Sequence, residues 1–344
     1  MEEVPPALEP PEGIMSNFIN PPSIHYVHVA VAVSALSVSV VAVAARTFAR
    51  VKYLKKFDLN DCALILSLAL MSAYVGLTIN TGRYGQGVHQ WNVPLPHFMV
   101  LLKFMNILET LYGPLLFLAK YVVLRQIEAI FLQHRFHSFS HTGLAILIWL
   151  NLIFYAGLTL SIILACIPRS KIWDRSVKGQ CIDVNAALIA SGAINILSDI
   201  GILILPLIAI RNLQASRKTK IKVGAIFAVG SFAIIASIVR FVYTVGLTKT
   251  EDLTYWIEPF AYWTEIEFAT IVLVACFPSF PVLFRSLRQE SKRRWFSSNK
   301  SGSWFTGSKP QADERPEHSS VKSLRGHEGN EGHELEDRNS ISMV

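Results

Sequence analysis

The sequence predicts an all-α membrane protein built as a bundle of seven transmembrane helices. Seven apolar runs are separated by short polar segments, and 51% of the 344 residues are hydrophobic while only 17% are charged. A helix needs about 20 mostly apolar residues to cross a bilayer, because every backbone N–H and C=O must be paired internally where water is absent. We therefore expect a multi-pass protein of the plasma membrane or an endomembrane. The runs are approximately His25–Ala45, Leu59–Ile79, Phe98–Val123, Gly143–Cys166, Val184–Ile210, Val223–Leu247 and Phe260–Phe284.

Basic residues near the ends of the runs predict the orientation, with the N-terminus outside and the C-terminus in the cytoplasm. Lys and Arg are enriched in cytoplasmic loops. They cluster after the first, fifth and seventh runs, in Arg46–Lys56, Arg211–Lys222 and Arg285–Arg294. The opposite side holds fewer of them. The segment from Arg169 to Lys178 is an exception, because it places four cations outside.

Composition divides the chain into three parts. Residues 1–24 contain six prolines and no Lys or Arg, which predicts an extended extracellular arm. Residues 25–285 form the seven-helix domain. From residue 286 onward, Ser, Gly and charged residues dominate. Such a segment buries too little apolar surface to offset its ordering entropy, so 286–344 are predicted to be a disordered cytoplasmic tail.

The formal net charge of +7 is spread over the segments that flank the apolar runs. Basic residues in that position favour contact with anionic lipid headgroups, by about 1 kcal/mol each. A nucleic-acid binder would instead need its cations gathered on one soluble face. We expect membrane lipid as a partner and no nucleic acid.

Two of the four cysteines, Cys166 and Cys181, lie at the two ends of one predicted outer loop. An oxidising compartment permits disulfides, so this placement favours a bridge between them over two separate thiols. Cys62 and Cys276 lie within runs and have no evident partner. The sequence contains no spacing typical of metal ligands, and we expect no metal.

The third apolar run carries an unusual number of polar or small residues along one face. At about 100° per residue they fall within an arc of roughly 120°, so this face should line the centre of the bundle. Pro114 is expected to kink the helix along it. The residues of this face are Lys103, Asn106, Glu109, Thr110, Gly113 and Lys120.

Later runs add charges of both signs, with Asn195 and Asp199 one turn apart in the fifth run. The sixth run adds Arg240, and the seventh adds Glu265 and Glu267. Charged groups in hydrocarbon normally face the bundle interior and pair, for example Lys120 with Asp199 or Arg240 with Glu267. Each could be a structural hydrogen-bonding contact between helices or part of a functional site.

If these residues form a site, they fall into two predicted classes. The candidate acids for catalysis are Asp199, Glu267 and Glu109. The candidate ligand-binding residues are Lys103, Asn106, Lys120, Asn195, Asp199, Arg240 and Glu267.

Several motifs give the chain a resemblance to the fungal rhodopsin-like integral membrane protein family of the satratoxin-cluster type. The resemblance covers about Val27–Arg288 and implies a seven-helix architecture and an association with secondary-metabolite gene clusters. Tyr121 and the additional acid Glu265 depart from the family pattern. The motifs are Phe57–Asp61, Tyr84–His89, Lys120, Cys166–Pro168, Trp173–Asp174, Gln180–Asp183, Asn195–Asp199, Leu205–Pro206, Lys220–Lys222, Phe227–Gly230, Ser237–Arg240 and Glu267–Pro278.

The family name suggests a retinal chromophore, but the residues argue against one. A retinal Schiff base needs a buried lysine, which rhodopsins place in the last helix. The run Phe260–Phe284 contains no lysine, whereas Lys103 and Lys120 lie in the third run. We predict no cofactor.

The first functional hypothesis is a receptor-like or accessory protein that binds an apolar metabolite between its helices and reports to a cytoplasmic signalling partner. The alternative is an intramembrane cyclase or isomerase of a secondary-metabolite pathway, in which a desolvated carboxyl group donates a proton. Nearby cations such as Lys120 and Arg240 can neutralise the acids, which favours binding over catalysis. A transporter is disfavoured because the chain shows no inverted repeat.

Overall fold

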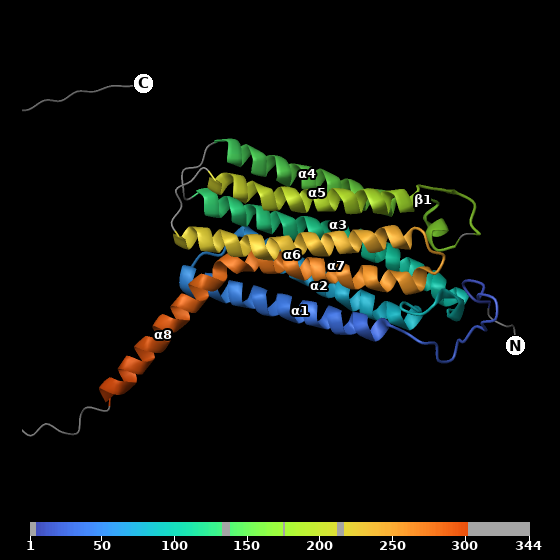
Figure 1. The fold of residues 1–344 in the computed structure, drawn as a ribbon, viewed down its shortest axis with the longest axis horizontal. Coiled ribbons are helices and arrows are strands. Elements are labelled where there is room, and N and C mark those ends of the chain that lie inside the picture. The colour runs from blue at the N-terminus through green and yellow to red at the C-terminus, as the bar shows by residue number, and fades with distance from the viewer. Residues whose placement is uncertain (1–4, 133–137, 175, 212–216, 302–344) are drawn as a thin grey trace, which may run out of the picture. The chain divides into compact units, whose positions relative to one another are not determined.

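The computed structural model describes residues 5–132, 138–174, 176–211 and 217–301. Within these ranges, seven helices are long and apolar enough to cross a membrane, which confirms the predicted fold class (Figure 1). They are α1 (His25–Phe48), α2 (Leu59–Thr81), α3 (Leu95–Leu132), α4 (Ser138–Ile163), α5 (Val184–Arg211), α6 (Arg217–Leu247) and α7 (Leu253–Cys276).

Helices that follow one another in the chain pack side by side, and α1 packs against α7 to close the bundle (Figure 1). Helix α3 contacts α7 and α5 in addition to its chain neighbours, and α7 contacts α1, α2 and α3 in addition to α6, so these two helices form the centre of the bundle. Gly113 permits a close approach of α3 to α4, since an added Cβ would lie 3.1 Å from the Tyr155 carbonyl oxygen. The predicted polar face of this helix therefore meets other helices.

Large apolar side chains cover the outside of the bundle. Trp149 and Ile153 of α4 and Leu197 of α5 are 62%, 67% and 66% exposed. In water a surface of this kind would be unstable, whereas in a bilayer it faces lipid chains of similar polarity. The exposed apolar surface agrees with the membrane assignment.

A two-stranded hairpin lies between α4 and α5 and marks one end of the bundle, here named the disulfide end. Strand β1 (Cys166–Ile167) pairs antiparallel with β2 (Gln180–Cys181), with Cys166 opposite Cys181. These two cysteines form the predicted disulfide. Which side of the membrane this end faces stays a prediction from the basic residues.

The N-terminal arm is tied to the α2–α3 loop at the disulfide end. The Ala7 amide donates to the Val93 carbonyl at 2.9 Å, and the Leu95 amide donates to the Pro5 carbonyl at 3.1 Å. Nearer α1, the Ile24 amide donates to the Gly87 carbonyl at 3.0 Å. These bonds hold the arm against the α2–α3 loop, and its extracellular location stays a prediction.

Beyond α7, a short 3₁₀ turn (Phe277–Ser279) leads into α8 (Phe280–Ser301). The predicted disordered tail therefore does not begin at residue 286. Leu283 and Leu287 recur at helical spacing among basic residues, a pattern typical of an amphipathic helix rather than a disordered segment. Residues 302–344, the rest of the predicted tail, lie outside the described residues.

Candidate ligand cavity and buried polar networks

A cavity of about 540 Å³ lies at the disulfide end, between α3, α4, α5, α6 and α7. This volume is within the range of sites for small organic molecules, and such sites are mostly apolar with a few polar groups. Both cysteines of the disulfide contribute to the wall. Apolar side chains supply most of the rest, among them Leu102, Met105, Leu188, Leu247, Ile257 and Phe260.

Glu109 is the acidic residue of the cavity wall. It follows Leu102, Met105 and Asn106 along α3, so it is the lining residue of this helix that lies deepest below the disulfide end. Within the described ranges, the half-buried Glu109 carboxyl has no hydrogen-bond or ion-pair partner. A polar group in apolar surroundings is costly unless something pairs with it. A ligand with a hydrogen-bond donor would meet that requirement.

Asn106 connects the cavity to the hairpin loop above it. Its Oδ1 accepts a hydrogen bond from Arg169 Nη2 at 3.1 Å, and its Nδ2 donates to the Ile162 carbonyl at 3.3 Å. The predicted ligand-binding residue Lys103 is exposed instead, with its Nζ 5.3 Å from the centre of the Trp173 ring. Asn106 therefore lines the cavity, whereas Lys103 holds the loop from outside.

Deeper in the bundle, Lys120 is almost completely buried and binds two residues of α5. Its Nζ lies 2.7 Å from Asp199 Oδ1 and donates to Asn195 Oδ1 at 2.7 Å. The Tyr155 hydroxyl of α4 donates to the same Asn195 oxygen at 2.6 Å. The first of the two expected ion pairs is present.

The second expected pair joins α6 to α7. Arg240 Nε donates to Glu267 Oε2 at 2.7 Å, and Asn195 Nδ2 donates to Glu267 Oε1 at 2.6 Å. The Ser237 hydroxyl lies within hydrogen-bond distance of both Asp199 and Glu267, at 2.6 and 2.9 Å. The two ion pairs thus form one network, in which two cations balance two carboxylates.

This central network separates the three candidate acids. Asp199 and Glu267 are each held by a cation and by further donors, as expected for structural ion pairs in a low-dielectric interior. Glu109 alone of the three faces the cavity without a partner among the described residues. The geometry therefore favours Glu109 as the acid available to a bound molecule.

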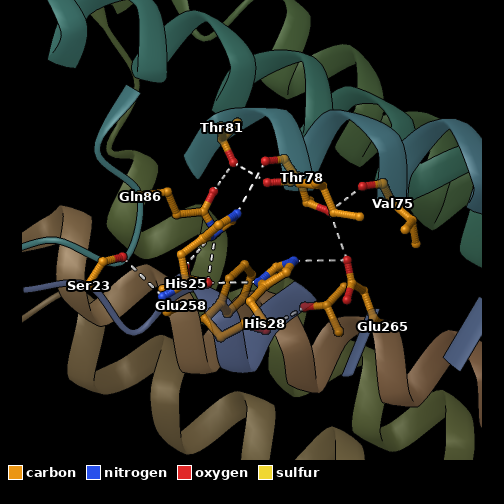
Figure 2. A network of polar contacts seen from close by, with 12 residues as sticks. Ser23, His25, His28, Val75, Thr78, Thr81, Gln86, Glu258 and Glu265 are labelled. Atoms are coloured by element: carbon orange, nitrogen blue, oxygen red, sulfur yellow. Dashed lines mark hydrogen bonds and ion pairs between the residues drawn. The ribbon is translucent and has the colours of Figure 1, made fainter. Parts of the chain in front are cut away.

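A second buried network, missed by the sequence analysis, joins α1 to α7 (Figure 2). We name it the His–Glu cluster, and it consists of His25, His28, Glu258 and Glu265. Figure 2 shows His28 between the two glutamates and Glu258 between the two histidines. The signal was present in the sequence, since each pair has a spacing, i and i+3 or i and i+7, that places both members on one helix face.

A third network lies at the opposite end of the bundle. Arg46 of α1 donates to Asp61 of α2 from Nε at 3.1 Å and to the Ala275 carbonyl of α7 from Nη1 at 2.5 Å. Arg50 Nη1 reaches the other Asp61 oxygen at 2.9 Å. All of these groups except Arg50 are buried. This arrangement fastens three helices.

Clusters of three or more His, Cys, Asp or Glu with the geometry of a metal site do not occur in the part of the chain that the structure describes. The His–Glu cluster is no exception, because the histidine nitrogens already face carboxylate or carbonyl oxygens.

Seven long apolar helices around buried ion pairs define a multi-pass membrane protein of the seven-helix class. Residues 45–286 match the fungal rhodopsin domain, and the chain belongs to that family. The expected resemblance is confirmed over most of the chain.

The chain is similar to fungal membrane and gene-cluster proteins. It is 35% identical over 213 residues to a SAT4 family membrane protein of Emericella nidulans, covering 62% of this chain and 54% of that protein. It is 27% identical over 287 residues to fugralins biosynthesis cluster protein 2 of Gibberella zeae, covering 81% and 71%. It is 24% identical over 253 residues to polyenoic acids biosynthesis gene cluster protein Ba17b of Metarhizium anisopliae, covering 69% and 68%. The match thus spans about half the length of the first of these relatives. No solved structure matches the chain.

The residues do not fit the retinal that the family name suggests. Helix α7 contains no lysine. Lys120, the buried lysine of the described part, uses its ammonium group to bind Asn195 and Asp199. No buried amine of the described residues is therefore free to form a Schiff base.

Proposed function

We propose that this protein binds an apolar metabolite in the cavity at the disulfide end and has a receptor-like or accessory role in fungal secondary-metabolite biosynthesis. The observation that carries the proposal is an apolar cavity of about 540 Å³ with the unpartnered Glu109 carboxyl deep inside it. The names of the relatives, two of which refer to biosynthesis clusters, supply the context.

The cavity also specifies the kind of ligand. Its wall favours a molecule with a largely apolar body, because burial of that body contributes about 25 cal/mol per Å². Glu109 favours a hydroxyl or amino group at the deep end and disfavours a carboxylate, which would bring two like charges together in a low dielectric. The ligand that fits best is an apolar alcohol or amine.

A route to the rest of the bundle begins at the cavity wall. The Phe260 ring lines the cavity and lies 5.9 Å from the Arg240 guanidinium, which belongs to the central network. A ligand that moves Phe260 would therefore act on the contacts among α3, α5, α6 and α7. In the receptor-like role, this change would reach a signalling partner at the opposite end of the bundle.

A cavity-filling substitution tests the proposal. Leu188→Trp on α5 places an indole in the cavity, whereas Leu197→Trp on the same helix places one on the exposed apolar surface. In a strain that lacks the native gene, we expect the Leu197→Trp protein to restore metabolite production and the Leu188→Trp protein to fail at equal membrane abundance. Equal restoration by both variants contradicts the proposal.

An intramembrane cyclase or isomerase is the second candidate, and the unpartnered Glu109 carboxyl is the observation that favours it. A carboxyl in an apolar site can stay neutral and donate a proton. Metabolite profiles of the deletion strain distinguish the two roles. Accumulation of an uncyclised or unisomerised precursor indicates an enzyme, whereas a uniform fall in titre indicates an accessory or receptor-like protein.

A further inference from the structure

We infer that the His–Glu cluster is a proton-binding site that exchanges protons with the surface through His25 and whose occupancy controls the packing of α1 against α7. The inference rests on counting the protons that the observed contacts require. It is independent of the proposed ligand cavity.

His28 lies between two carboxyl groups. Its Nδ1 is 2.7 Å from Glu258 Oε2, and its Nε2 is 3.2 Å from Glu265 Oε1. The Nε2 contact is a hydrogen bond, whereas the Nδ1 contact has the distance of an ion pair without the alignment of a hydrogen bond. A carboxylate oxygen only accepts, and a bare ring nitrogen at these distances would repel it, so each of the two contacts requires a proton on the imidazole nitrogen or on the carboxyl group. A neutral imidazole supplies one of the two.

The two contacts of the His25 ring also require two protons. Its Nδ1 lies 2.6 Å from Glu258 Oε1, and its Nε2 lies 3.2 Å from the Ile79 carbonyl oxygen (Figure 2). A carbonyl can only accept, so Nε2 must carry a proton, and a second proton must lie between Nδ1 and the carboxylate.

The four contacts together require four protons. Two neutral histidines and two ionised glutamates hold only two, so the observed geometry binds two more. With these, two positive and two negative charges balance, or a tautomer of the same net charge is present. Removal of one proton leaves an uncompensated negative charge on buried groups, which is strongly unfavourable.

The surroundings offer no other cation to the two carboxylates within the described ranges. From α2, Thr78 Oγ1 donates to Glu265 at 2.8 Å, and from the following loop Gln86 Nε2 donates to Glu258 at 3.2 Å. Both are neutral donors. Glu265 Oε2 is buried and has no partner at all among these residues.

The remaining titratable neighbours do not supply the balancing charge either. Tyr74 of α2 and Tyr262 of α7 lie near the two glutamates and are neutral when protonated. Tyr74 also interacts electrostatically with Glu109 of α3 and with Arg240 and Glu267, and this Arg240 is paired with Glu267. The two histidines are therefore the groups that compensate Glu258 and Glu265.

The exposed fractions define the route for proton exchange. The side chain of His25 is 16% exposed, whereas those of His28, Glu258 and Glu265 are 0%, 1% and 0% exposed. The contacts connect His25 to Glu258, Glu258 to His28, and His28 to Glu265 in one series. A proton that enters at His25 can thus move toward Glu265 through the His25–Glu258 and His28–Glu265 hydrogen bonds and across the 2.7 Å ion-pair contact between Glu258 and His28.

The cluster lies where several segments of the disulfide end meet. It joins α1 to α7 directly, and the Gly87 amide of the adjoining loop donates to the Thr254 carbonyl of α7 at 2.9 Å. Loss of the two protons would turn the attraction between α1 and α7 into repulsion between two carboxylates held against neutral rings. The pH on that side of the protein would then control this interface.

Nuclear magnetic resonance of the full chain in nanodiscs, with ¹⁵N-labelled histidine, tests the proton count. The His28 signals are assigned by their loss in the His28→Gln variant. Near pH 7 we expect both ring nitrogens of His28 in the wild type to carry protons. A His28 ring with one bare nitrogen in the folded protein overturns the inference.

Thermal unfolding as a function of pH tests the consequence. Stability depends on pH in proportion to the difference in bound protons between the folded and unfolded states. We expect the stability of the wild type to fall as the pH rises from about 7 to about 10. The stability of His28→Gln should not show this fall. His97→Gln, which changes an exposed histidine at the same end, should keep it. An equal pH dependence of stability in all three proteins contradicts the inference. If His28→Gln does not fold, the protonation of the His28 ring in the wild-type nuclear magnetic resonance spectra decides the question.

Discussion

Arg240 and Glu267 form an ion pair with an Nε to Oε2 distance of 2.7 Å, and both side chains are almost completely buried. The guanidinium also lies 5.3 Å from the Tyr112 ring and 5.9 Å from the Phe260 ring, so it contacts both the central network and the wall of the cavity. Its Nη2 has no partner among the described residues. Arg240 is therefore the residue through which a change in the cavity would reach the ion pairs that hold α3, α5, α6 and α7 together.

Glu267→Gln should strongly destabilise the protein. The substitution leaves the Arg240 cation buried without its counter-charge, which costs about 3–5 kcal/mol. The double variant Arg240→Gln/Glu267→Gln removes both charges and should recover part of the loss. Thermal unfolding in detergent measures the effect, with the exposed Glu251→Gln as the control. If the double variant is as unstable as the sum of its single variants, the two residues do not act as a pair.

Asp199→Asn separates a structural from a functional acid. Because Asp199 pairs with Lys120 at 2.7 Å, we expect the variant to leave the ammonium without its counter-charge and to lower the amount of folded protein in the membrane. Membrane abundance and metabolite titre are measured in the same strain. A normal abundance with a reduced titre would instead identify Asp199 as a functional acid, and wild-type values of both would exclude either role.

Gly87→Ala should destabilise the disulfide end. Gly87 has a φ of +83°, a backbone conformation that residues with a side chain rarely adopt. An added Cβ would lie 2.5 Å from Glu258 Oε1 and 2.9 Å from the His25 amide nitrogen. The new methyl group would force apart the loop and the His–Glu cluster. Gly76→Ala is the matched control, because that position has nothing within 4 Å and lies inside α2. We expect the control to gain up to about 1 kcal/mol from its better helix propensity, and comparable unfolding temperatures for the two variants would refute the expected clash.

The sequence was sufficient to predict the seven helices and to place charges of both signs on their inner faces, but not to determine which of these charges pair. The length and composition of the apolar runs are enough to recognise them as transmembrane helices, and a charge in hydrocarbon requires a partner of the opposite sign. The pairs of Lys120 with Asp199 and of Arg240 with Glu267 were examples, because Lys103, Glu109 and Glu265 were further candidates, and the choice among them required the positions of the helices.

The His–Glu cluster was not predicted because three of its four members, all except Glu265, fall outside an apolar run or at its edge. Helix α7 begins at Leu253 rather than at Phe260, so Glu258 was assigned to a loop although it lies inside the helix. His25 and His28 stand at the start of the first run, where polar side chains are common. Their shared face becomes informative only once α1 is known to pack against α7.

The cavity could not be predicted from the sequence either, because it depends on how five helices and the hairpin leave space between them. The polar face of α3 was recognised, but its members have different environments. Lys103 is outside, Asn106 and Glu109 line the cavity, and Lys120 is in the central network. A helical wheel gives the direction of a side chain and carries no information about what lies opposite.

Glu109→Gln should change which ligands the cavity accepts. Three probes of equal chain length, decylamine, 1-decanol and decanoate, are compared by their displacement of an environment-sensitive apolar dye from the protein in nanodiscs. With wild-type protein we expect the amine to bind most tightly and the acid most weakly, because the Glu109 carboxylate attracts a cation and repels an anion. A neutral amide accepts and donates hydrogen bonds but carries no charge, so Glu109→Gln should lose the preference for the amine over the acid while the alcohol is little affected. Glu251→Gln, on the exposed surface, controls for unspecific changes in charge. If all three probes displace the dye in the same order of affinity from wild type and Glu109→Gln, the cavity binds ligands but Glu109 has no role in selecting them. If no probe displaces the dye, the cavity is not a binding site for such ligands.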